Sequence, residues 1–288
     1  MSGPGIGDPE HSFFIAIDSD GCVFDTMALK HQTCFAPALV DVFDFQAIES
    51  IVSTLWIAIN LDSRSRGRNR FLGLQSVLGA LMGVPEAAGL RHWISVKAAL
   101  DHWLDDESAP SLPALQRVIE RDGVHELKSV CDWSLDVDRR VSRLDVMEPF
   151  SGVREVLVRG ADFADLVVIS QTPEVTVRRD WAATGLEPLV RKVLGQESGS
   201  KSELLAACTG SRYSNDRILM IGDAPGDRLA AEAIGALFFP VIPGQEEQSW
   251  ALLIDEGLRR FRDGTYRGVF QDERVQRFYS VLPEWRDG

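Results

Sequence analysis

The 288-residue sequence predicts an α/β fold in which helices cover a parallel sheet and a helical domain is inserted into it. Two observations carry this prediction. Short, wholly apolar runs end abruptly at polar residues, which is typical of strands buried on both faces of a sheet. Between the first two runs, about 120 residues carry their apolar side chains at helical spacing instead.

The apolar runs define the expected strands. They are Phe13–Ile17, Leu166–Ile169, Ile218–Ile221 and Ala236–Val241. The first three are followed at once by Asp18, by Ser170 and by Gly222-Asp223. Ligands of open α/β sheets bind at the carboxyl ends of the strands. The chemistry of the protein is therefore expected at this edge of the sheet.

The inserted segment predicts several amphipathic helices. Its apolar faces are Phe71, Leu74, Leu78, Leu81 and Met82; Trp93, Val96, Leu100, Trp103 and Leu104; and Leu112, Leu115, Val118 and Ile119. We therefore expect residues 1–25 and 146–245 to form the α/β core and residues 26–145 a helical cap domain. Residues 246–288 are expected to form a C-terminal helical extension whose aromatic side chains pack on the core.

Composition excludes several classes of partner and site. The formal net charge of −13 argues against nucleic acid or an anionic membrane as the main partner. Residues 1–12 lack the basic and apolar stretches of a signal peptide, and no apolar run approaches a membrane-spanning length. Four scattered cysteines form neither a metal motif nor a disulfide framework: Cys22, Cys34, Cys131 and Cys208. A cytoplasmic protein acting on a small molecule is the expectation.

The first polar motif is Asp18-Ser19-Asp20-Gly21. Side chains alternate along an extended chain, so Asp18 and Asp20 can point the same way, and Gly21 permits a sharp turn. Two carboxylates this close repel each other unless a proton or a cation lies between them. A hard cation such as Mg²⁺ would resolve the repulsion. The alternative is an ordinary acidic surface turn.

The second and third motifs offer anion-binding groups. In Ser170-Gln171-Thr172-Pro173, Thr172 suits the N-cap and Pro173 the first turn of a helix whose backbone N–H groups would face an anion. Ser200 and Glu203 fit a capping box that places Lys201 at a helix start, where a cation is slightly unfavourable. A plain capping segment and a solvated lysine are the alternatives.

The fourth motif, Gly222-Asp223-Ala224-Pro225-Gly226-Asp227, again places two carboxylates after an apolar run. Asp223 is expected to bind the metal directly, and Asp227 to hold water or Lys201. The alternative is a loop with acidic side chains. Order and spacing together favour one site, because nucleophile, hydroxyl, lysine and acidic pair each follow a strand or begin a helix.

These four motifs resemble those of the haloacid dehalogenase-like hydrolase superfamily, whose members are mostly phosphatases. The resemblance covers about residues 13–25 and 166–243, and Cys22 stands where threonine or valine is usual. It implies a Rossmann-like core, a helical cap between the first two motifs, and Mg²⁺ held by Asp18, Asp223 and the backbone carbonyl of Asp20. It also implies that Asp18 is the nucleophile, Asp20 the general acid and base, and Asp227 a supporting residue. Phosphate would be bound by Ser170, Gln171 and Lys201.

The implied activity is magnesium-dependent hydrolysis of a small phosphorylated metabolite through an aspartyl-phosphate. A phosphomutase and a phosphonate hydrolase, the latter using Lys30 or Lys97 for a Schiff base, are alternatives. A non-catalytic phosphometabolite-binding protein is the alternative from another class. Cap residues expected near the substrate are Arg64, Arg68, Arg70, Lys30 and His31, with pairing of the arginines to nearby acids as the other explanation.

Overall fold

The structure is a computed structural model and describes residues 5–285. Residues 1–4 of the expected core and 286–288 of the expected extension lie outside the described residues. The chain divides into two compact units, and each is described by itself. One unit comprises the residues up to Met27 and Asp145–Leu282, and the other comprises Ala28–Leu144 with the described residues after Leu282. In the described part of the chain, no helix is long and apolar enough to span a membrane.

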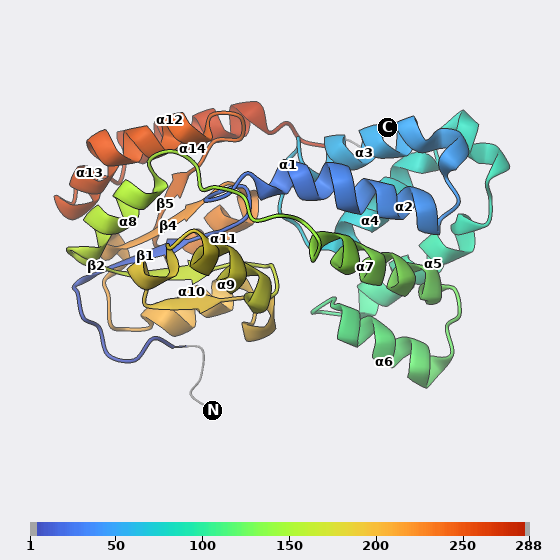
Figure 1. Cartoon of the computed structure of the whole chain (residues 1–288), viewed down its shortest axis with the longest axis horizontal. Helices are drawn as coiled ribbons and strands as arrows, with labels where there is room; N and C mark the ends of the chain where they lie inside the picture. The colour runs from blue at the N-terminus through green and yellow to red at the C-terminus, as the bar shows by residue number, and fades with distance from the viewer. Residues whose placement is uncertain (1–4, 286–288) are drawn as a thin grey trace. The chain divides into compact units, whose positions relative to one another are not determined.

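The first unit contains the expected parallel sheet, which confirms the α/β fold. Its strands are β1 (Phe13–Ile17), β2 (Ala164–Ile169), β3 (Lys192–Leu194), β4 (Ile218–Gly222) and β5 (Leu237–Pro240). All neighbours are parallel in the order β3-β2-β1-β4-β5, with β1 in the middle (Figure 1). The sequence missed β3 because three residues give no periodicity. The order changes direction beside β1, where such folds form their ligand sites.

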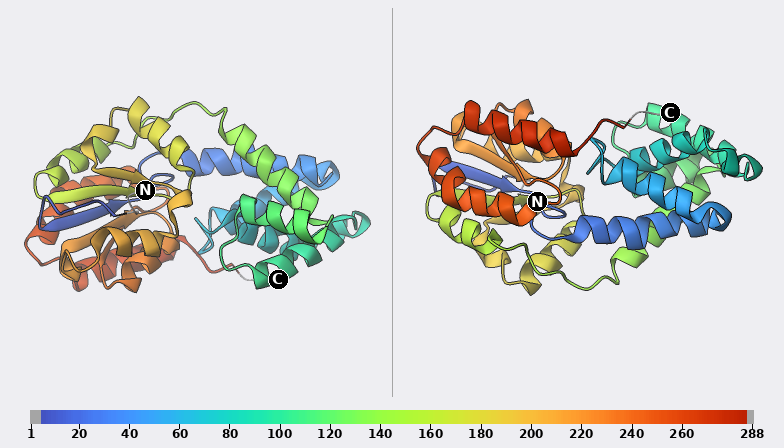
Figure 2. Two further views of the ribbon diagram at one scale, coloured as in Figure 1. Left: turned by 90° about the horizontal axis from the view of Figure 1, so that it is seen from below. Right: turned by 90° about the horizontal axis from the view of Figure 1, so that it is seen from above.

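Alternate side chains of each strand supply two separate cores, since neighbouring strand residues point to opposite faces. One core joins Ile15, Ile17 and Val168 to α8 (Val153–Ala161), α9 (Glu174–Ala183), α12 (Glu246–Leu252) and α13 (Leu258–Arg262). The other joins Phe14 and Ala16 to α10 (Lys201–Thr209), α11 (Pro225–Ala233) and α14 (Val269–Val281). Figure 2 shows the sheet between these two layers of helices. Burial on both faces explains why the strands read as unbroken apolar runs.

The second unit is helical throughout residues 28–144, apart from its loops. After α1 (Thr26–Lys30), which crosses the boundary, and a π-helical turn at His31–Phe35, it contains α2 (Ala36–Val42), α3 (Glu49–Asn60), α4 (Arg70–Leu81), α5 (Trp93–Asp106), α6 (Leu112–Asp122) and α7 (Leu127–Val141). The apolar faces predicted for α4 and α5 form its core, with Phe71 and Trp93 almost fully buried. Met82 is an exception: it follows the end of α4 and is 57% exposed.

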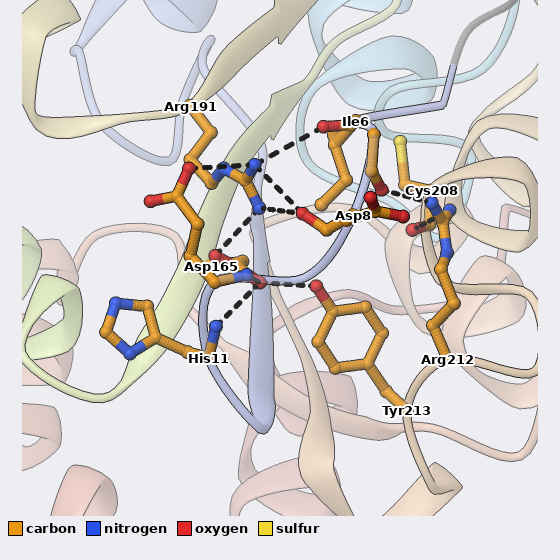
Figure 3. Close-up of polar contacts among 10 residues, drawn as sticks. Ile6, Asp8, His11, Asp165, Arg191, Cys208, Arg212 and Tyr213 are labelled. Atoms are coloured by element: carbon orange, nitrogen blue, oxygen red, sulfur yellow. Dashed lines mark hydrogen bonds and ion pairs between the residues drawn. The ribbon is translucent and has the colours of Figure 1, made fainter.

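Both ends of the described chain are held by packing. The aromatic side chains of α12–α14 are buried except for the half-buried Tyr279, and Trp250 and Phe278 are fully inaccessible. Beyond Leu282 the chain joins the helical unit, where Trp285 packs against the apolar core. At the other end, Asp165 of β2 accepts hydrogen bonds from the backbone N–H groups of Glu10 and His11, while Arg191 donates to the carbonyls of Ile6 and Asp8 (Figure 3).

Candidate active site

The polar motifs meet where the central strands end. Beyond β1 and β2 the sheet pairing continues for one residue, because the Asp18 N–H donates to the Ile221 carbonyl (2.9 Å) and the Ser170 N–H to the Leu194 carbonyl (3.0 Å). Asp18 is therefore fixed at the sheet edge by backbone bonds before its side chain makes any contact. Asp223 follows β4 directly and is completely buried.

Three carboxylates and one lysine form the centre of the site. Asp18, Asp223 and Asp227 each offer an oxygen, and these oxygens lie within 4.8 Å of one another. The Lys201 ammonium contacts Asp18 Oδ2 at 2.9 Å and Asp227 Oδ1 at 2.6 Å. All three acids are buried. The structure thus brings together residues from the first, third and fourth sequence motifs.

The start of α11 explains the position of Asp227. Pro225 occupies the first helical position, which needs no N–H, and Asp227 lies in the first turn, where the helix dipole favours an anion. Its Oδ2 accepts a hydrogen bond from the Ala224 N–H at 3.0 Å. A Cβ on Gly222 would lie only 2.3 Å from the same oxygen. Glycine is therefore required at position 222 for the carboxylate to sit against the end of β4.

Lys201 is the first residue of α10, as the sequence predicted. The Ser200–Glu203 capping box forms: the Glu203 N–H donates to Ser200 Oγ, and the Ser200 N–H donates to the Glu203 carboxylate. A cation at a helix N-terminus faces the positive end of the dipole. Asp18 and Asp227 offset that cost, because both contact the ammonium directly.

Burial controls the charge states in the cluster. It raises the pKa of Asp18 to about 7, against the opposing effect of Lys201. It also raises the pKa of Asp227 above the ordinary value. Burial acts to lower the pKa of Lys201, but the two carboxylates outweigh it and raise that pKa, so the ammonium keeps its proton. Burial likewise raises the pKa of the Cys22 thiol, which is consistent with a packing role.

The residues present fit a magnesium ion. The cluster contains three buried carboxyl groups, and the Lys201 ammonium contacts two of them, so negative charge exceeds positive charge in a region of low dielectric when the acids are ionised. Carboxylate oxygens are the donors that Mg²⁺ prefers, and an Mg²⁺ site commonly leaves room for water and phosphate oxygens. Asp18 and Asp223 would hold the ion, while Asp227 is engaged with Lys201 and the Ala224 N–H.

Asp20 lies in the loop after β1, where Gly21 has a φ of +76° that glycine adopts without strain. Hydroxyl groups donate to both of its oxygens, Thr26 to Oδ1 and Thr172 to Oδ2 at 2.5 Å. The prediction that Thr172 caps a helix is wrong: α9 begins at Glu174 with Pro173 at the cap position. Nothing in the sequence signalled Thr26 as a partner of Asp20, because it is one hydroxyl at a helix start.

Ser170 and Gln171, the predicted phosphate-binding residues of the second motif, precede Thr172, which contacts Asp20 in this loop. Ser170 directly follows β2, is 1% exposed, and accepts a hydrogen bond from the Thr172 N–H at 3.2 Å. Gln171 is exposed, and its side-chain amide donates to the Gly199 carbonyl at 3.3 Å. The Gln171 side chain is thus engaged with the loop before α10. A role in phosphate binding for Ser170 and Gln171 stays a prediction.

Lys30 and His31 belong to the helical unit, and both are largely buried. Nδ1 of His31 accepts a hydrogen bond from the Trp56 indole at 2.9 Å. The His31 ring stacks on Phe35 with centroids 4.9 Å apart and an interplanar angle of 14°. Because the indole only donates, neutral His31 carries its proton on Nε2. Their contact with substrate stays a prediction.

The arginine segment is largely engaged within its own unit. Arg64 pairs with Glu284 at 2.5 Å and Arg70 with Asp138 at 2.6 Å. Arg68 is exposed, and its guanidinium lies 3.4 Å from Ser65 Oγ. Pairing with nearby acids was the alternative explanation, and the structure supplies those acids for Arg64 and Arg70. Binding of an anionic substrate by Arg64, Arg68 and Arg70 stays a prediction.

Comparisons with known proteins yield matches among solved structures alone. The sequence matches no protein-family model and no curated protein. A structure from Bacteroides fragilis, described as a haloacid dehalogenase-like hydrolase, is 14% identical, with a TM-score of 0.49 and coverage of 83% of this chain and 93% of that one. A haloacid dehalogenase-like family hydrolase from Xanthomonas campestris is 14% identical, with a TM-score of 0.45 and coverage of 90% and 99%.

A protein from Haemophilus somnus, described as a predicted phosphoglycolate phosphatase, is 18% identical, with a TM-score of 0.44 and coverage of 80% and 86%. The decisive observations are internal to this chain: the strand order of the sheet, the motifs at its carboxyl edge, and the helical unit inserted after β1. These features confirm the Rossmann-like α/β core with a helical insertion that the resemblance to haloacid dehalogenase-like hydrolases implied.

Proposed function

We propose that the protein is a magnesium-dependent phosphohydrolase that acts on a small phosphorylated metabolite through an aspartyl-phosphate on Asp18. One observation carries the proposal: the buried contact of Asp18 with Lys201 inside a cluster of three carboxylates. The cluster fits a divalent cation, and the lysine supplies positive charge beside the nucleophile. An anionic phosphate ester can approach a carboxylate only where such charges offset the repulsion.

The proposed reaction begins with attack of an Asp18 carboxylate oxygen on phosphorus. The bond from phosphorus to the ester oxygen breaks as Asp20 gives its proton to that oxygen, and the alcohol leaves. Asp20, now a carboxylate, takes a proton from water, whose oxygen attacks the aspartyl-phosphate. Inorganic phosphate is released and Asp18 is restored. Bound Mg²⁺ would neutralise negative charge on the phosphoryl oxygens.

Lys201 and Asp227 have a joint role in this scheme. Asp227 holds the ammonium at 2.6 Å, and the ammonium in turn contacts Asp18 at 2.9 Å. The ammonium keeps its charge, because both carboxylates raise its pKa. It is therefore available to bind the phosphoryl oxygens as they approach Asp18. Ser170, at the end of the neighbouring strand β2, would supply a hydroxyl to the same group.

The test is a panel of phosphate monoesters assayed with Mg²⁺ and with EDTA, followed by trapping of the intermediate. Borohydride reduces an acyl phosphate to an alcohol, so wild-type protein quenched during turnover should yield a peptide with homoserine at position 18. Asp18→Asn is the matched control and should yield none. Absence of hydrolysis across the panel would favour a phosphometabolite-binding protein, and transfer of the phosphoryl group to another hydroxyl would favour a mutase.

The role of Asp20 is tested separately. Asp20→Asn should slow hydrolysis of an alkyl phosphate by about 10²–10⁴-fold, the usual contribution of general acid-base catalysis. The first step of p-nitrophenyl phosphate cleavage should suffer less, because its leaving group needs no proton. Equal loss on both substrates in single-turnover phosphorylation would contradict a leaving-group role.

A further inference from the structure

Two buried tryptophans from separate helices hold the loop that follows the nucleophile. The Trp181 indole N–H, from α9, donates to Ser19 Oγ at 3.0 Å. The Trp250 indole N–H, from α12, donates to the backbone carbonyl of Cys22 at 2.9 Å. Both indoles are fully inaccessible to solvent. The two bonds reach the loop on either side of Asp20.

The loop is compact, and bonds within it set its internal shape. The Gly21 N–H donates to the Phe24 carbonyl at 2.8 Å, and the Val23 N–H donates to the Ser19 carbonyl at 2.8 Å. These bonds join loop residues to one another, so the place of the loop against the core depends on further contacts. The sheet fixes the chain at Asp18, through Ile221. Beyond that point, the Phe150 N–H donates to the Val23 carbonyl at 2.9 Å and the Thr172 hydroxyl donates to Asp20. The indoles from α9 and α12 add bonds at Ser19 and Cys22.

Packing keeps each indole immobile. Trp181 meets Phe24 edge to face, with centroids 6.2 Å apart and an interplanar angle of 86°. Trp250 lies against Gly152, where a Cβ would come within 3.2 Å of Trp250 Cβ. The start of α12 is fixed by Ser249, whose hydroxyl accepts the Ile242 N–H at 3.0 Å. Contacts other than the bond to the loop therefore hold each indole in place.

From these contacts we infer that Trp181 and Trp250 are positioning residues, which act through Ser19 and Cys22 to fix the carboxylates of Asp18 and Asp20. The inference deepens the proposed function and rests on it. It also gives the C-terminal extension a role in catalysis, because Trp250 belongs to α12. Neither indole touches the reacting atoms. Their effect is on the geometry from which Asp18 attacks and Asp20 transfers its proton, and such geometry strongly affects rate.

The chain provides matched controls for a purely structural effect. Trp93 and Trp103 are also buried, yet within residues 5–285 their indole nitrogens have no hydrogen-bond partner. Substitution of either by phenylalanine removes indole volume without removing a bond. Trp103→Phe therefore reproduces the packing loss of Trp181→Phe and Trp250→Phe, and lacks the loss of a donor to the loop.

The experiment compares the three variants in the full chain. Trp181→Phe and Trp250→Phe should each lower kcat by about tenfold and leave KM within about twofold, because placement of the reacting groups changes more than substrate binding does. Trp103→Phe should keep the wild-type kcat although it shifts the urea midpoint. Amide hydrogen exchange in the peptide that covers residues 19–25 should quicken in Trp181→Phe and Trp250→Phe alone.

Ser19→Ala provides a second route, since it removes the acceptor of the Trp181 bond and leaves the indole in place. It should reproduce the faster loop exchange and the loss of kcat. Wild-type exchange rates in residues 19–25 of Trp181→Phe, Trp250→Phe and Ser19→Ala would overturn the inference, even if the stability of these variants fell. A wild-type protein with no turnover on any ester refutes the proposed function instead, and the exchange measurement still decides whether the indoles position the loop.

Discussion

Both ends of the sheet contain buried aspartates, but the contacts of these aspartates differ between the two ends. At the amino end, Asp165 pairs with Arg191 at 3.0 Å and accepts hydrogen bonds from the Tyr213 hydroxyl at 2.5 Å and from two backbone N–H groups (Figure 3). At the carboxyl end, Asp18, Asp223 and Asp227 form a cluster in which the Lys201 ammonium contacts Asp18 and Asp227. Asp165 thus has a cation and three hydrogen-bond donors, whereas three carboxyl groups lie around one lysine at the other end.

This difference indicates a structural role for Asp165 and a ligand-binding role for the cluster at the carboxyl end. A buried carboxylate with an arginine and several donors is stable where it is and holds the N-terminal segment to β2. A cluster in which carboxylates outnumber cations is costly, unless a ligand with positive charge binds there. Burial alone does not distinguish the two ends, since Asp165 and Asp223 are both completely buried.

The largest expected effect comes from the nucleophile. Asp18→Asn should lower kcat by at least about 10⁴-fold, because the amide forms no acyl phosphate. Asp165→Asn is the matched change at the other end of the sheet and should keep kcat within about twofold. Initial rates on the best ester of the panel measure both. Comparable losses of activity in the two variants would mean that the two ends are not functionally distinct.

For stability, Asp165→Asn is expected to have the clear effect that it lacks on kcat. Asp165→Asn should lower the free energy of unfolding by about 2 kcal/mol, because Arg191 and Tyr213 lose a charged partner. The value lies below that for a fully buried pair, since the Arg191 side chain is 22% exposed. Urea unfolding in EDTA measures it. A smaller loss than that of a surface control such as Asp263→Asn would contradict a structural role for Asp165.

The stability of the metal-free protein should depend on pH through Asp18. Its pKa rises from 3.8 to about 7 on folding, with burial as the main cause. The folded state therefore binds a proton that the unfolded chain has lost between those values, and stability falls as pH rises from about 4 to 7. Between pH 5 and 7.5 we expect a loss of about 2 kcal/mol relative to Asp18→Asn, which cannot titrate. Parallel profiles for the two proteins in EDTA would contradict this prediction.

The smallest effect concerns Asp223. Asp223→Asn removes one of three neighbouring negative charges, so it should raise the metal-free stability by about 1 kcal/mol. It should also remove most of the stabilisation that millimolar Mg²⁺ gives the wild type. Thermal unfolding with EDTA and with Mg²⁺ measures both effects. Unchanged stabilisation by Mg²⁺ would place the ion elsewhere.

How far the sequence predicts this molecule varies by region. The runs before Asp18, Ser170 and Asp223 identify three strands and the polar residues at their carboxyl ends, because burial on both faces leaves short, unbroken apolar runs. The sequence does not predict strand β3, since Lys192–Leu194 is too short to show any pattern. The contact of Lys201 with Asp18 can be expected from motif order, but its geometry depends on how α10 packs against the sheet.

The polar partners of single residues lie further beyond prediction. Asp165 stands second in β2, and no local feature links it to Arg191 or Tyr213. Thr26 and Thr172 are ordinary hydroxyls until the fold brings both to Asp20. Trp250 and Cys22 are separated by 228 positions. Such pairings are set by tertiary packing, for which neither periodicity nor spacing carries a signal.

The bond between Trp250 and Cys22 also bears on the order in which the protein matures during synthesis. Cys22 leaves the ribosome 228 residues before its indole donor, Trp250. Contacts between such distant positions form late, because a long stretch of chain must first be closed into a loop. A nascent chain halted before α12 would already contain every carboxylate of the site. The full catalytic rate of the proposed enzyme should therefore be reached only after α12 has docked.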